Sequence, residues 1–126
     1  MPDQPRILLI TPDLMIASRL AGAAVACGWA LDSIVGLNAT PPATGYRVAI
    51  LDLQGSPAAG GDLVAHARER LTTLGPQPDT GPALVAFGPH VAHERLAAAR
   101  AAGADDVVSR GELLGAFAAV IGRHVV

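Results

Sequence analysis

A buried strand that ends in a carboxylate is the feature that most constrains this chain. Residues 48–53 read Val-Ala-Ile-Leu-Asp-Leu, so four apolar residues stand directly before Asp52. A short continuous apolar run is typical of a strand covered on both faces, as in a parallel sheet. In open α/β sheets, ligands bind beyond the carboxyl ends of the strands. Asp52 is therefore the first candidate for a functional residue.

The rest of the chain alternates between predicted strands and predicted helices. Asp32 and Ser33 interrupt the second apolar run, which favours an edge position for that strand. Strands that alternate with helices predict an α/β fold, with a parallel sheet and helices on both faces. The predicted strands are 6–10, 29–35, 46–52, 83–87 and 106–109, and the predicted helices are 12–27, 62–74, 90–102 and 112–124.

The link over residues 36–45 does not have a helical composition. It contains Asn38, two prolines and two glycines. Nine or ten extended residues span about 30 Å, which is enough to return along a sheet without a helix. We therefore expect the second crossover helix to be shortened or missing.

Thr11, Pro12 and Asp13 form a helix-start signature. We expect Thr11 to be the N-cap, Pro12 to take the first helical position and Asp13 to lie in the first turn. Asp13 has a second interpretation, because a shifted backbone would let it reach a metal. Capping explains this acid without a metal, since a carboxylate complements the helix dipole.

Composition excludes several classes of protein. The chain is 51% hydrophobic and 16% charged, so we expect one folded domain over residues 1–126. A net charge of −2 and 3% aromatic residues argue against nucleic-acid and membrane surfaces. A polar N-terminal segment and a single cysteine, Cys27, predict a cytoplasmic location.

Three segments in this order resemble the receiver domain of bacterial response regulators, the CheY-like, flavodoxin-type fold. They are the apolar run 7–10, the Asp52 strand, and Ala-Ala-Gly-Ala-Asp-Asp at 101–106 followed by Arg-Gly-Glu-Leu at 110–113. The resemblance covers nearly the whole chain. It implies a three-layer sandwich whose five parallel strands have the order 2-1-3-4-5.

The family's chemistry needs an acidic pair and an acceptor Asp around Mg²⁺, then a Ser or Thr and a Lys that bind the phosphoryl group. In this chain the resemblance assigns Asp52 to the acceptor and assigns Thr11 and Pro12 to the acidic pair. Gly88 falls on the hydroxyl position and Arg110 on the lysine position. Only Asp52 is retained unchanged, so we expect a degenerate pocket with no Mg²⁺ or other cofactor.

Several roles remain open for the pocket residues. Asp52 is either an ion-pair partner of Arg110 in a relict pocket or a phospho-acceptor with altered metal chemistry. His90 follows Gly88 near the expected pocket mouth. His90 and His93 have a spacing that two metal ligands on a helix also use, but no third ligand accompanies them. The remaining histidines, His66 and His124, have no evident partner.

The resemblance implies a signalling module and not an enzyme. We expect a pseudo-receiver that contacts protein partners, including a second copy of the chain, through residues 90–123. The alternatives are a phospho-accepting receiver that uses Asp52, and a binder of small anions or ligands on the same scaffold. In the last case Arg110, His90 and the Gly88 amide would form the anion site.

Overall fold

Five parallel strands form one sheet in the order β2-β1-β3-β4-β5 in the computed structural model, which describes residues 4–55 and 60–125. β2 lies at an edge, as its Asp32 and Ser33 predict, and every pairing is parallel. The strands are β1 (Arg6–Ile10), β2 (Ala30–Ile34), β3 (Tyr46–Asp52), β4 (Ala83–Gly88) and β5 (Asp106–Ser109). The predicted fold class and strand order are confirmed.

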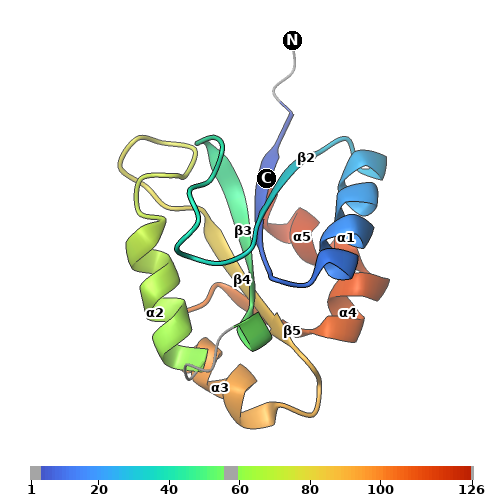
Figure 1. Ribbon diagram of the computed structural model, residues 1–126, viewed down its shortest axis with the longest axis vertical. Coiled ribbons are helices and arrows are strands. Elements are labelled where there is room, and N and C mark those ends of the chain that lie inside the picture. Colours follow the sequence, from blue (N-terminus) through green and yellow to red (C-terminus); the bar gives the residue numbers. More distant parts are fainter. Residues whose placement is uncertain (1–3, 56–59, 126) are drawn as a thin grey trace.

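Helices cover both faces of the sheet, so the molecule has three layers (Figure 1). α1, α4 and α5 lie on one face, and α2 and α3 lie on the other. Each helix presents an apolar stripe to the sheet, which buries two separate core clusters. The helices are α1 (Leu14–Ala26), α2 (Gly60–Arg70), α3 (His93–Ala101), α4 (Arg110–Gly115) and α5 (Phe117–Val125), with a short 3-10 helix η1 (Leu53–Gly55) after β3.

The crossover from β2 to β3 contains no helix, as the prolines and glycines of the link predict. The link runs across the α2 side of the sheet as an irregular loop. Its Leu37, Ala39 and Ala43 pack partly buried against the second core cluster. This loop therefore takes the place of a crossover helix and covers the sheet with only these three apolar side chains.

The C-terminal helix predicted over 112–124 is instead two helices that break at Ala116, which has φ −140° and ψ 40°. Ser109 ends β5 and caps α4 by accepting a hydrogen bond from the Glu112 amide. α4 therefore begins directly from the strand, while α5 turns its own apolar face to the sheet. Phe117 then packs on Trp29 with ring centroids 5.8 Å apart. The neighbouring Gly115 is a poor helix former, which favours a break at this point.

Candidate functional site

The carboxyl-terminal ends of four strands lie on the same side of the sheet and bring the predicted site residues together. Thr11 follows β1, Asp52 ends β3, Gly88 ends β4 and Arg110 follows β5. The strand registers fix this arrangement, since Ile10 pairs with Leu51 and Gly88 pairs with Ser109. Parallel topology therefore gathers residues that lie about a hundred positions apart in the sequence.

Asp52 is only 4% exposed, so its carboxylate depends on partners inside the protein. Its Oδ2 accepts a hydrogen bond from the Thr11 hydroxyl at 2.7 Å. Its Oδ1 accepts one from the backbone amide of Gln54 at 2.9 Å. Both oxygens thus have a neutral donor, although a carboxylate has room for about four hydrogen bonds.

Thr11 is 1% exposed, and its hydroxyl is engaged both as donor and as acceptor. It donates to Asp52 and accepts from the Asp13 amide at 3.1 Å. Because its oxygen faces Asp52 and Asp13, it does not cap the first turn of α1. The expectation that Thr11 is the N-cap is therefore wrong.

Asp13 is the N-cap of α1 and not a first-turn residue. Its backbone is extended, and its Oδ1 accepts from the amides of Met15 at 2.9 Å and Ile16 at 3.2 Å. Pro12 consequently precedes the cap and is outside the first helical position. A capping side chain must reach the amides two and three residues ahead, and only Asp13 has the spacing to reach these two.

The expected ion pair between Asp52 and Arg110 is not among the ion pairs of residues 4–55 and 60–125. Arg110 Nη2 instead donates to the side-chain oxygen of Gln54 at 2.6 Å. Gln54 therefore bridges the two charged groups, with its backbone amide on Asp52 and its side chain on Arg110. Arg110 begins α4, and its Nε is buried without a hydrogen-bond partner.

Sequence reasoning missed Gln54. A usable signal was present, because an Asp side chain often accepts from the amide two residues later. The contact with Arg110 had no such signal, since it joins residues 56 positions apart.

Gly88 and His90 differ in how closely they approach the site. Gly88 is buried, and a Cβ built there would lie 3.5 Å from the Leu96 side chain and 3.8 Å from Leu53. These are ordinary contacts, so a small side chain fits. His90 is exposed on the β4–α3 turn, and no hydrogen bond of the described residues links it to Asp52.

The other histidines lie apart from Asp52. His93 begins α3 and is exposed. His124, expected to be unpaired, has its Nε2 3.0 Å from Asp106 Oδ2, which also accepts from Arg123. This cluster joins the end of α5 to the start of β5. Within the part of the chain that the structure describes, no group of three or more His, Cys, Asp or Glu side chains is arranged to hold a metal.

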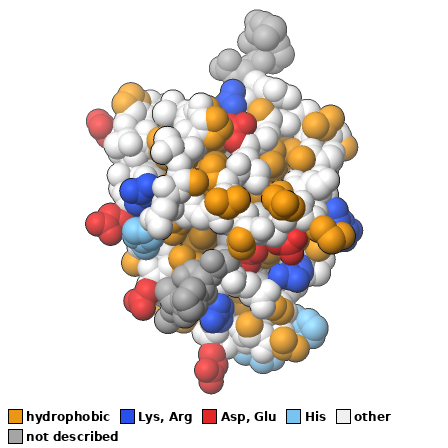
Figure 2. All heavy atoms as spheres, in the orientation of Figure 1, with side chains coloured by type: hydrophobic (Ala, Val, Ile, Leu, Met, Phe, Trp, Pro, Cys, Tyr) orange, Lys and Arg blue, Asp and Glu red, His pale blue; other side chains and the backbone are white. Residues whose placement is uncertain are grey.

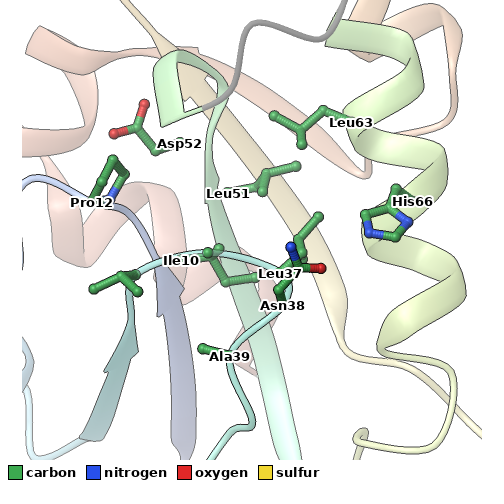
Figure 3. Close-up of a pocket in the computed structure, with 11 residues that line it drawn as sticks. Ile10, Pro12, Leu37, Asn38, Ala39, Leu51, Asp52, Leu63 and His66 are labelled. Atoms are coloured by element: carbon green, nitrogen blue, oxygen red, sulfur yellow. The ribbon is translucent and has the colours of Figure 1, made fainter.

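A cavity of about 360 Å³ lies beside Asp52 on the α2 side of the sheet (Figure 3). Its floor is the end of β1 and β3, and its walls are the 35–39 loop and α2. Besides Asp52, the polar side chains of its lining come from Asn38 and His66. No sequence pattern predicts this cavity, because its size depends on how the irregular loop lies over the sheet.

Structural comparison connects this fold with receiver domains. A response regulator receiver protein from Burkholderia phymatum superposes with a TM-score of 0.74 at 16% identity, over 97% of this chain and 95% of that one. A response regulator signal receiver domain from Bermanella marisrubri gives 0.72 at 20% identity, over 98% and 100%. A two-component response regulator from Clostridium difficile gives 0.67 at 20% identity, over 95% and 97%.

The chain therefore has the CheY-like receiver fold. No family model and no curated protein matches its sequence. Across residues 4–55 and 60–125, no helix is both long enough and apolar enough to cross a membrane.

Proposed function

We propose that this chain is an atypical receiver domain of a two-component-type signalling protein, acting in the cytoplasm through protein–protein contact without phosphorylation of Asp52. The observation that carries the proposal is the 2.7 Å hydrogen bond between Thr11 and Asp52. Thr11 stands where the resemblance expects a metal-binding acid. Its hydroxyl occupies the acceptor carboxylate with a neutral donor and adds no negative charge for a cation.

The donor set around Asp52 does not fit Mg²⁺. This ion prefers near-octahedral oxygen ligation with carboxylates and water. Pro12 has no side-chain donor atom, and the Thr11 hydroxyl is engaged with Asp52. The Asp13 carboxylate caps α1 through two backbone amides. Of the site residues Thr11, Pro12, Asp13 and Asp52, only Asp52 has a carboxylate that does not cap a helix, so we propose that the domain works without a metal.

The surface proposed for partners is residues 90–123, and a second copy of the chain is one of them. In α3 and the turn after it, Ala97, Ala101 and Ala102 are exposed. Small side chains let another helix approach closely, although alanine is also simply a good helix former. Sedimentation velocity of the wild type and of Ala101→Arg tests the self-association: a dimer that the substitution dissociates supports it, and a monomeric wild type at high concentration contradicts it.

Phosphorylation is tested by intact-mass spectrometry after incubation with Mg²⁺ and acetyl phosphate. We expect no phosphoryl adduct on the wild type. The positive control is a variant that restores the family residues: Thr11→Asp, Pro12→Asp, Gly88→Ser and Arg110→Lys. We expect this variant to gain one phosphoryl group, and the further change Asp52→Asn to abolish it.

A wild-type adduct that Asp52→Asn removes would contradict the proposal and favour the phospho-accepting alternative. Beryllofluoride gives an independent measurement, because a solved relative is the beryllofluoride-activated receiver domain of DrrB, with a TM-score of 0.68 at 15% identity. We expect amide resonances near Asp52 to shift with this reagent in the restored variant and to stay unchanged in the wild type.

A further inference from the structure

The cavity beside Asp52 lies at the topological switch point of the sheet. β1 and β3 are neighbours there, and the chain leaves them in opposite directions along the sheet order. Ile10 and Leu51 are register partners on these two strands, and both line the cavity. In doubly wound sheets this crevice is where ligands bind.

The cavity exists because the β2–β3 crossover has no helix. A helix in this position would cover the sheet with a broad apolar face. The loop instead offers Leu37, Ala39 and Ala43, which are only partly buried. Space remains between the loop and α2, and Val35, which lines this space, is 64% exposed. In the space-filling view, further hydrophobic side chains lie at the surface in the middle of the molecule (Figure 2).

Hydrogen bonds fix the two walls of the cavity in position without a ligand. Arg70 Nε donates to the Leu37 carbonyl at 3.0 Å, which ties the loop to α2. The Ala39 amide donates to the Gly36 carbonyl at 3.1 Å, which closes a turn in the loop. The site is thus largely formed in advance, and a ligand would not have to order this segment.

The lining combines an apolar body with two polar side chains. Leu51, Leu63 and Ile10 provide the apolar surface. The Asn38 amide and the His66 ring project toward one another from the loop and from α2 (Figure 3). About 360 Å³ is within the range of pockets for small molecules, which are mostly apolar with a few polar groups.

The charge at the end of the cavity narrows the ligand class. Asp52 lines that end, and its oxygens are held by Thr11 and Gln54. Its carboxylate opposes an anionic ligand, because no Lys or Arg side chain lines this cavity among the residues that the structure describes. This separates the cavity from the anion site expected at Arg110.

We propose that this cavity binds a neutral heteroaromatic molecule of one or two rings. The rings would lie on Leu51 and Leu63, and a nitrogen edge with one donor and one acceptor would face Asn38 and His66. An amide side chain offers both a donor and an acceptor, which suits such an edge. The inference is independent of whether Asp52 is phosphorylated.

Amide NMR titration of the wild type with benzimidazole tests the proposal. Saturable shifts are expected for the amides of residues 37–39 and 63–66 and for the Asn38 side chain. Indane has the same two-ring shape without nitrogen. It is expected to bind about tenfold more weakly, because a tenfold change in affinity corresponds to the net contribution of one or two hydrogen bonds. A benzimidazole carboxylate is expected to bind more weakly than benzimidazole.

Two matched substitutions separate filling the cavity from general damage. Ala39→Phe places a ring in the cavity and is expected to abolish the shifts. Ala65→Phe adds the same ring to an exposed position of α2 that does not line the cavity, and binding should persist. Asn38→Ala should remove the preference for benzimidazole over indane.

Three results would overturn the proposal. The first is the absence of shifts in the folded wild type at millimolar benzimidazole. The second is unchanged binding to a folded Ala39→Phe variant. The third is equal affinity for benzimidazole and indane, which would remove the role assigned to Asn38 and His66.

Discussion

Replacing Thr11 by valine removes one hydroxyl from a buried position and keeps the shape of the side chain. Thr11 is 1% exposed and Asp52 is 4% exposed, so water does not readily take over the lost contact. The carboxylate would keep only the Gln54 amide as a donor. The Asp13 amide would also lose its acceptor.

The expected loss in the free energy of unfolding follows from these two contacts. A hydrogen bond to a charged group contributes about 1.5–3 kcal/mol, and a neutral one about 1 kcal/mol. Asp13 lies partly exposed, so water recovers some of the second contribution. We therefore expect Thr11→Val to destabilise the protein by about 2–3 kcal/mol. Thr11→Ser keeps the hydroxyl and loses one methyl group, which costs about 1 kcal/mol.

Urea unfolding followed by circular dichroism measures both variants on one scale. The same substitution in an Asp52→Asn background should cost about 1 kcal/mol less, because hydrogen bonds to a carboxylate are roughly twice as strong as neutral ones. Equal costs for Thr11→Val and Thr11→Ser would refute the reasoning. So would an unchanged cost in the Asp52→Asn background, since the hydroxyl would then not act through the carboxylate.

Further predictions concern three other positions. Burial, followed by the hydrogen bond from its hydroxyl to Asp32, raises the pKa of Tyr46 above its usual 10.0. Because the folded-state pKa lies above 10, Tyr46 keeps its full contribution to the free energy of unfolding below pH 10. Above pH 10 this free energy falls by about 1.4 kcal/mol per pH unit. Urea titrations at alkaline pH should show that Tyr46→Phe removes this slope, and an unchanged slope would disprove the assignment. Asp13→Ala should lower the free energy of unfolding by about 1 kcal/mol, while Asp13→Ser should restore most of it because serine also caps; equal loss in both would argue against capping. Gly88→Ser should change stability by less than about 1 kcal/mol, since its Cβ meets only ordinary contacts; a thermal melt showing severe destabilisation would contradict this geometry.

The strands and their order could be predicted because each depends on a local pattern. The apolar run before Asp52 and the polar interruption at Asp32 are visible in sequence, and both strands lie where these patterns require. The missing crossover helix was equally predictable, since proline removes a backbone donor and disfavours helix in the preceding residue.

Helix ends and side-chain partners were less predictable. Thr11 and Asp13 are both good capping residues, and the choice between them depends on Thr11 meeting a carboxylate 41 positions away. The Gln54 bridge and the pairing of His124 with Asp106 are also long-range contacts. Strand patterns show that the site lies at the carboxyl-terminal ends of the strands. They do not determine which neutral or charged group each side chain there takes as its hydrogen-bond partner.

β3 carries Asp52 at one end and Arg47 near the other, and Arg47 Nη1 donates to the Val125 carbonyl at 2.8 Å. The last turn of α5 is thus fastened to the start of the strand whose far end holds the buried carboxylate. Arg47 and Asp52 are five positions apart, about 17 Å of extended backbone with no intervening loop. Mechanically, β3 thus links the pocket around Asp52 to the end of α5 through one continuous strand, and no flexible loop lies between them.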